Sequence, residues 1–187
     1  CGWFGCPVAF LLLILVNDPL QSDFDLAEIL SWRAQHQADR LAFQCELPGV
    51  RAAAWAERWQ EITYFDLHAR AQGVANEMRE QGVVPGRVLL AFDSGVDFVA
   101  SFFGCLYAGV VAVPIPVPSG PSGRLRWQQV VRDADPRMVL TNARHREAIQ
   151  ALGLDGLRVG LVDGLKDESV AEVAHAKRTD KLAFLQY

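Results

Sequence analysis

Cysteine and histidine are scarce in this 187-residue chain, and neither is arranged for a metal site. The sequence has four of each, with no C-x-x-C pair and no local cluster of histidines. The cysteines are Cys1, Cys6, Cys45 and Cys105, and the histidines are His36, His68, His145 and His175. Because this cysteine density is too low for a disulfide-stapled secreted domain, we expect a reducing, cytoplasmic location. A cysteine inside an apolar run, as Cys105 is, is expected to be a core residue.

An excess of positive charge is also missing. Eighteen Lys and Arg residues stand against 22 Asp and Glu residues, which gives a formal net charge of −4. A mildly acidic chain gives no electrostatic reason to bind nucleic acid or an anionic membrane, so we expect neither partner. Basic residues cluster only briefly, as at Arg144–Arg146, which is typical of a solvated helix surface.

The sequence lacks both glycine-rich motifs that hold nucleotide phosphates, G-x-x-x-x-G-K-[ST] and G-x-G-x-x-G. It also lacks a Ser/His/Asp order and a paired-carboxylate motif. The nearest feature is PVPSGPSGRLRWQQ, residues 116–129, a loop that opens a helix containing Arg124 and Arg126. Its N–H groups and arginines suit an anion site, but a flexible crossover loop with an exposed basic turn is the simpler interpretation. No catalytic, cofactor-binding or metal-binding residue is therefore assigned.

The first sixteen residues, CGWFGCPVAFLLLILV, carry no charge. They lack an initiating Met, a basic n-region and a small-residue cleavage site, so they do not resemble a signal peptide. They are shorter than the roughly twenty residues of a spanning helix, and Pro7 interrupts them. Three origins stay open: a non-native leader, a linker from a larger chain, or a membrane anchor. We treat residues 1–21 as an apolar leader of uncertain origin, and we expect a chain that begins at Cys to be a fragment.

A second uncharged run, Phe98–Val117, has the length of a membrane span. Gly109 divides it, and Pro114 and Pro116 exclude a continuous helix across its second half. The run therefore predicts a buried helix followed by a β-branched strand, with glycines that let the helix lie close to its neighbours.

Orderly patterns begin at Ser22. Residues 22–39 have the spacing of an amphipathic helix, with a capping box formed by Ser22 and Asp25. Residues 41–47 and 58–64 predict two short strands or hairpin arms. Residues 65–82 predict a second helix, which ends at Gly82. Its apolar face consists of Leu67, Ala71, Val74, Ala75 and Met78.

Beyond Gly82, short apolar runs alternate with segments of helical period. Strands are expected at 87–92, 110–115, 137–141, 157–162 and 182–187, and helices at 95–109, 123–135 and 143–153. Such alternation predicts βαβ units, and continuous Val, Leu and Ala runs indicate strands buried on both faces. The predicted fold class is α/β, with a mostly parallel sheet in a three-layer αβα arrangement.

A known family is recognisable in these residues. The run GVANEMREQGVVPGRVLLAFDSGVDFVASFFGCLYAGVVAVPIPVP, followed by RLRWQQVVRDADPRMVLTN, resembles the amino-terminal part of the acyl-adenylate-forming (AMP-binding) ligase superfamily. The stretch FFGCLYAGVVAVP with its Pro-rich loop is most similar to fatty acyl-AMP ligases. The resemblance covers roughly residues 24–187, and it implies that residues 22–187 are the incomplete amino-terminal portion of such a domain.

The resemblance implies a function for the intact protein. Such a ligase uses ATP and Mg²⁺ to activate a long-chain fatty acid as an acyl-adenylate, and it then passes the acyl group to a carrier-protein thiol. The implied partners are therefore an acyl carrier protein or a downstream synthase module of polyketide or nonribosomal-peptide assembly. The final DKLAFLQY is similar to the strand that precedes the phosphate-binding loop in that family. The motifs for ATP and Mg²⁺ are expected beyond Tyr187, so these 187 residues alone are expected to be inactive.

Two alternatives stay open. One is an acyl-CoA synthetase or a nonribosomal-peptide adenylation domain, which is distinguished from the first hypothesis by the acceptor it uses, coenzyme A or a carrier-protein thiol. The other is a non-catalytic, doubly wound binding module.

Overall fold

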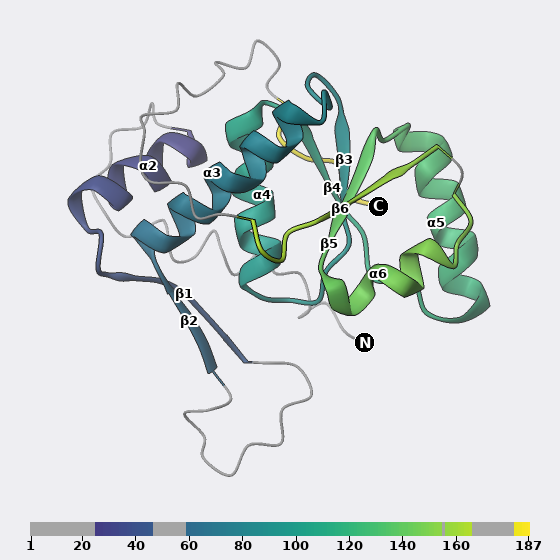
Figure 1. Ribbon diagram of the computed structural model, residues 1–187, viewed down its shortest axis with the longest axis horizontal. Coiled ribbons are helices and arrows are strands. Elements are labelled where there is room, and N and C mark those ends of the chain that lie inside the picture. The colour runs from purple at the N-terminus through teal and green to yellow at the C-terminus, as the bar shows by residue number, and fades with distance from the viewer. Residues whose placement is uncertain (1–24, 47–58, 155, 166–181) are drawn as a thin grey trace.

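The computed structural model describes residues 25–46, 59–154, 156–165 and 182–187 (Figure 1). Its elements, in chain order, are α2 (Leu26–His36), β1 (Leu41–Glu46), β2 (Trp59–Thr63), α3 (Tyr64–Glu80), β3 (Arg87–Leu90), α4 (Val96–Ala108), β4 (Val111–Pro114), α5 (Gly120–Ala134), β5 (Met138–Thr141), α6 (Ala143–Gln150) and β6 (Arg158–Leu161). The leader proposed for residues 1–21 lies outside the described residues.

A parallel sheet forms the centre of the molecule. Its four strands lie in the order β4-β3-β5-β6, and every neighbouring pair is parallel. The last described segment, 182–187, lies beside β4 and forms one parallel bridge, between Phe184 and Ala112. Hydrogen bonds from Ala112 N to Ala183 O (3.1 Å) and from Leu185 N to Ala112 O (2.9 Å) hold it there. The predicted parallel sheet is confirmed, with residues 182–187 bridged at its edge instead of forming a full strand.

Helices cover both faces of this sheet, which gives three layers (Figure 1). Neighbouring residues of β3 show the division: Leu90 packs with α3 and α4, and Leu89 packs with Trp127 of α5 and Ile149 of α6. Both leucines are fully buried. Since successive side chains of a strand point to opposite faces, one short apolar strand supplies two cores. The predicted αβα class is confirmed.

The uncharged run Phe98–Val117 is divided as expected. It supplies most of α4, which ends at Gly109 with φ of 73°, and then the whole of β4. The left-handed conformation at Gly109 lets its N–H group close the helix against the carbonyl of Cys105. Among the described residues, no helix has both the length and the apolar character needed to cross a membrane.

The helices α3 and α4 approach each other closely. The five residues predicted for the apolar face of α3 are all buried. A side-chain carbon placed on Gly104 of α4 would lie 2.7 Å from Val74 Cγ1 and 3.1 Å from the Ala71 carbonyl oxygen. Glycine is therefore required at 104, because the backbone of α4 lies against side chains of α3.

Two predicted helix starts are wrong. The first helix was predicted to be capped by Ser22, with Asp25 as its third residue. In the structure Asp25 is itself the N-cap, in extended conformation, and its carboxylate accepts from Glu28 N at 2.8 Å. The Glu28 carboxylate accepts from Asp25 N in return, which completes the capping box one turn later than expected. Helix α5 begins at Gly120 and not at 123, since Pro121 fits the first turn of a helix.

The strands β1 and β2 form a separate antiparallel hairpin beside α3 and α4. It projects from the body of the molecule (Figure 1). One face of the hairpin, with Phe43 and Ile62, is buried in the core, while Leu41 and Trp59 stay exposed. The two predicted hairpin arms are confirmed.

Candidate functional site

The order of the strands indicates where a ligand site belongs. From β3 the chain crosses through α4 to β4 on one side, and from β5 it crosses through α6 to β6 on the other side. Helices α4 and α6 pack on opposite faces of the sheet. In open α/β sheets, ligands bind at the carboxyl ends of the strands where such connections diverge. The candidate site therefore lies after β3 and β5.

A cluster around Asp93 occupies this position. Asp93 follows β3, and its Oδ2 atom accepts from His145 Nε2 (3.1 Å) and Arg144 Nη1 (3.2 Å), both in the first turn of α6. The His145 side chain is 11% exposed and that of Asp93 is 40% exposed. The cluster thus joins the ends of β3 and β5 through one half-exposed carboxylate.

Two further carboxylates reach the same helix start. Asn142, the N-cap of α6, donates from Nδ2 to Asp97 Oδ2 of α4 (3.0 Å), and Asp163, after β6, accepts from the Ala143 N–H group. The Asn142 side chain makes no capping bond to its own helix. Since carboxylates are favoured at the positive end of a helix, Asp163 takes the place of a local cap, while Asp93 and Asp97 bind side chains at the same helix start.

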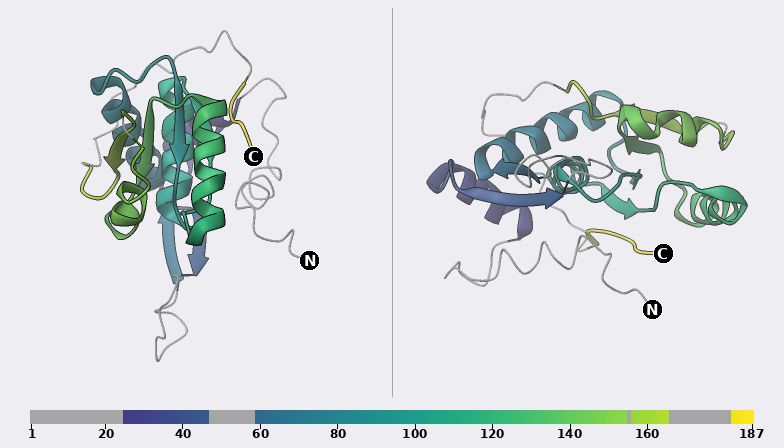
Figure 2. Two further views of the ribbon diagram at one scale, coloured as in Figure 1. Left: turned by 90° about the vertical axis from the view of Figure 1, so that its right-hand side faces the viewer. Right: turned by 90° about the horizontal axis from the view of Figure 1, so that it is seen from below.

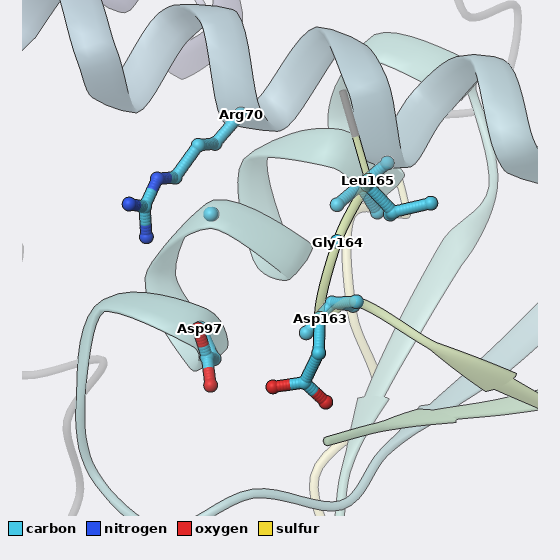
Figure 3. A pocket seen from close by; sticks show the side chains of 8 residues that line it. Arg70, Asp97, Asp163, Gly164 and Leu165 are labelled. Carbon is cyan, nitrogen blue, oxygen red and sulfur yellow. The ribbon is translucent and has the colours of Figure 1, made fainter. Parts of the chain in front are cut away.

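A cavity of about 280 Å³ lies beside this cluster (Figure 3). Its walls come from α3, α4 and the turn after β6, and they include Arg70, Asp97 and Asp163. Figure 3 shows the Arg70 side chain and the two carboxylates around the same open space. The cavity therefore shares Asp97 and Asp163 with the α6 cluster and carries both signs of charge.

The family resemblance implies that Mg²⁺ and ATP bind to the intact protein. Among residues 25–46, 59–154, 156–165 and 182–187, no group of three or more His, Cys, Asp or Glu residues is arranged to hold a metal ion. The N–H group of Ala143 is already bound by Asp163, so it is not open to a phosphate. Neither a Mg²⁺ site nor an ATP site is assigned to the described residues, and no step is assigned through them. The contacts of Asp93, His145 and Arg144 link the ends of β3 and β5.

Arg124 and Arg126, the two arginines of the possible anion site, make different contacts. Arg124 lines a groove between α5 and α6, whereas Arg126 donates from Nη2 to the Tyr187 carbonyl at 2.6 Å. The Tyr187 hydroxyl donates to Asp133, also on α5, and this hydrogen bond raises the pKa of Tyr187. Arg126 therefore holds the last described segment and does not join Arg124 in one site.

The structure also gives the burial and contacts of the other cysteines and histidines among the described residues. Cys105 is fully buried, and Cys45 is half-buried, with burial raising the pKa of its thiol. His36 stacks on Trp32 at the surface. His68 is buried, with Nδ1 2.7 Å from the Tyr107 hydroxyl, and burial raises the pKa of Tyr107. Cys1, Cys6 and His175 lie outside the described residues.

Sequence reasoning missed the aspartates of the site. Asp93, Asp97 and Asp163 are far apart in the chain, and no motif spacing joins them. A usable signal existed, because Asp93 and Asp163 each follow a predicted parallel strand and Asn142 follows another. Polar residues directly after parallel strands gather at one edge of the sheet.

Comparison with known proteins places most of the chain in one family. The family model described as AMP-binding enzyme matches residues 30–187. The chain is 28% identical over 172 residues to the medium-chain-fatty-acid–[acyl-carrier-protein] ligase JamA of Moorena producens, covering 87% of this chain and 28% of JamA. It is 34% identical over 84 residues to the long-chain-fatty-acid–AMP ligase FadD23 of Mycobacterium tuberculosis, covering 45% of this chain and 14% of FadD23.

The fold agrees with these sequences. The crystal structure of the fatty acid AMP ligase from Legionella pneumophila superposes with a TM-score of 0.73 at 26% identity, covering 87% of this chain and 27% of that chain. A fatty acyl-adenylate ligase of the same organism, in complex with acyl adenylate and pyrophosphate, gives a TM-score of 0.70 at 25% identity, covering 87% of this chain and 27% of that chain. The chain therefore spans between a seventh and three tenths of the length of these relatives.

Proposed function

Because the chain belongs to the AMP-binding enzyme family, we propose that it is the amino-terminal part of an ATP-dependent ligase that activates a fatty acid as its acyl-adenylate. The observation that carries this proposal is the likeness of its fold, over 87% of its length, to a fatty acid AMP ligase. Residues 22–187 form the amino-terminal portion of the domain, and residues 1–21 precede it as a leader.

In the proposed reaction, the fatty-acid carboxylate attacks the α-phosphorus of ATP and pyrophosphate leaves. A carrier-protein thiol then attacks the acyl carbon, a thioester forms and AMP leaves. ATP, as a substrate, would supply the leaving group. A Mg²⁺ ion, for which the described residues offer no cluster of ligands, would supply neutralisation of charge on the phosphates. The residues of this chain contribute the sheet and its carboxyl edge, where Asp93, Asp97 and Asp163 hold the start of α6.

The acceptor is the finer part of the proposal. The name of JamA specifies an acyl carrier protein as its acceptor, and this relative matches 87% of the chain. We therefore prefer a carrier thiol to coenzyme A. A free-standing binding module without catalysis has no comparable support.

Fatty-acid-dependent exchange of pyrophosphate into ATP tests the activity. The 187-residue chain alone is expected to show no exchange, whereas the complete reading frame that contains it should show exchange that depends on a fatty acid. Exchange by the 187 residues alone would refute the expected inactivity, and a complete protein without exchange would refute the ligase. Acyl transfer to coenzyme A but not to a carrier thiol would refute only the acceptor.

A further inference from the structure

The two helical layers carry charge of opposite sign. Helix α5 has three arginines against one aspartate and α6 has two arginines against one glutamate, a net +3 on a chain of net −4. Helices α2, α3 and α4 on the other face sum to −2. Figure 1 shows α5 and α6 together on one side of the sheet, and α5 faces the viewer in the left view of Figure 2. The α5–α6 face is therefore the basic face of an acidic chain.

A groove opens on this basic face, between the start of α5 and the end of α6, with a volume of about 600 Å³. We name it the α5–α6 groove. Its apolar lining includes Pro118, Pro121, Leu125, Ala148 and Leu152, with Arg124 among them. A concave, apolar surface with one arginine among its lining residues has the composition of a protein-binding surface.

Leu125 gives the groove an unusual feature. This side chain is 61% exposed, the most exposed large hydrophobic residue among those described. It stands between Arg124 and Arg126 in the sequence, and all three are exposed. An exposed leucine alone needs no explanation, but one that borders an apolar groove and a cation provides a contact for an amphipathic partner.

We propose that the α5–α6 groove is the docking surface for an acidic helix of the carrier protein that receives the acyl group. The partner's apolar side chains would fill the groove against Leu125 and Leu152, and a carboxylate of the partner would face Arg124. This inference rests on the proposed function for the identity of the partner. The groove itself is separate from the Asp93 cluster and from the cavity beside it.

The chemistry of the surface favours a protein over other anionic partners. Nucleic acid is held by many cations along its phosphates, whereas one arginine lines this groove and the remaining lining is apolar or glycine. A short acidic helix needs only an apolar socket and a few cations around it.

Binding of a purified, fluorescently labelled holo acyl carrier protein to the 187-residue chain tests the proposal. We expect saturable binding that weakens as salt is raised, because the contact is partly ionic. Arg124→Glu should weaken it by about tenfold, since attraction becomes repulsion. Leu125→Ser should weaken it at low and high salt alike. Neither change should lower the melting temperature, because Arg124 and Leu125 are exposed and a glutamate suits the start of a helix.

A matched charge reversal provides the control. Arg40 is exposed between α2 and β1, away from α5 and α6, so Arg40→Glu should leave the affinity within about twofold of the wild type. Equal losses from Arg40→Glu and Arg124→Glu would overturn the proposal. So would no binding of the carrier, or binding only to phosphatidylserine vesicles. Pyrophosphate exchange needs no carrier, so failure here is distinguishable from failure of the ligase.

Discussion

At the scale of single residues, Gly104 fixes how closely two helices meet. Its missing side chain leaves room for Val74 of α3. We predict that Gly104→Ala lowers the free energy of unfolding by about 1–3 kcal/mol, because the added carbon overpacks the contact. Urea unfolding followed by circular dichroism measures the change.

Gly123 is the control for this substitution. It also lies within a helix, but the nearest atom to an added side-chain carbon is 3.6 Å away. Gly123→Ala should therefore be neutral or should raise stability by up to about 1 kcal/mol through helix propensity. Equal destabilisation by the two variants would show that close packing of α3 and α4 is not the cause.

Cys45 offers a second prediction for a single residue. Burial, followed by the charge of Asp97, raises the pKa of its thiol, while a hydrogen bond from the Val96 backbone opposes this shift. A raised pKa leaves less thiolate at a given pH, so Cys45 should react with iodoacetamide at pH 8 more slowly in the folded chain than in urea. Peptide-resolved mass spectrometry measures this rate.

The pH dependence of Cys45 has a definite sign. Because its pKa is raised in the folded state, the folded state favours the neutral thiol. Its contribution to stability is present below the ordinary thiol pKa and is lost as pH rises through the raised value. Labelling of Cys45 in the folded chain should therefore keep rising with pH after the unfolded chain has reached its plateau. Coincident pH profiles would contradict the assignment.

At the scale of elements, helix α6 depends on distant residues for its cap. Asp163 accepts from Ala143 N–H, a group that no side chain of α6 itself binds. We predict that Asp163→Ala lowers the free energy of unfolding by about 0.5–2 kcal/mol, as loss of a local cap does. Glu147→Ala, on the exposed side of the same helix, should change it by less than about 0.5 kcal/mol. Thermal and urea unfolding would check both variants.

The ends of elements mark the limit of what the sequence predicted. The existence and order of the described helices and strands followed from apolar periodicity, because burial alone sets that pattern. The starts of α2 and α5 did not, since Asp25 and Glu28 compete with Ser22 for the cap and Pro121 is compatible with both loop and helix. The candidate site was missed because Asp93, Asp97 and Asp163 meet only after the sheet forms.

At the scale of the whole molecule, one sheet couples two cores. Leu89 and Leu90 are adjacent, fully buried, and belong to opposite cores. We predict that Leu89→Ala and Leu90→Ala each lower the free energy of unfolding by about 2–5 kcal/mol, and that each variant unfolds in a single transition. Tryptophan fluorescence, to which the buried Trp127 contributes, and far-ultraviolet circular dichroism should report the same midpoint. Separate midpoints would show that the faces unfold independently.

The carboxylates gathered at α6 also bear on the order of folding. Helix α6 has eight residues, too few for a stable isolated helix, and its partners Asp93 and Asp97 lie 52 and 45 residues earlier in the chain. Closing such long loops is slow, because their entropy is lost before the contacts form. We therefore expect α6 to become ordered after β3, α4 and β5 have assembled. Asp163→Ala should then accelerate unfolding and leave the folding rate almost unchanged, which is the kinetic signature of a contact absent from the transition state.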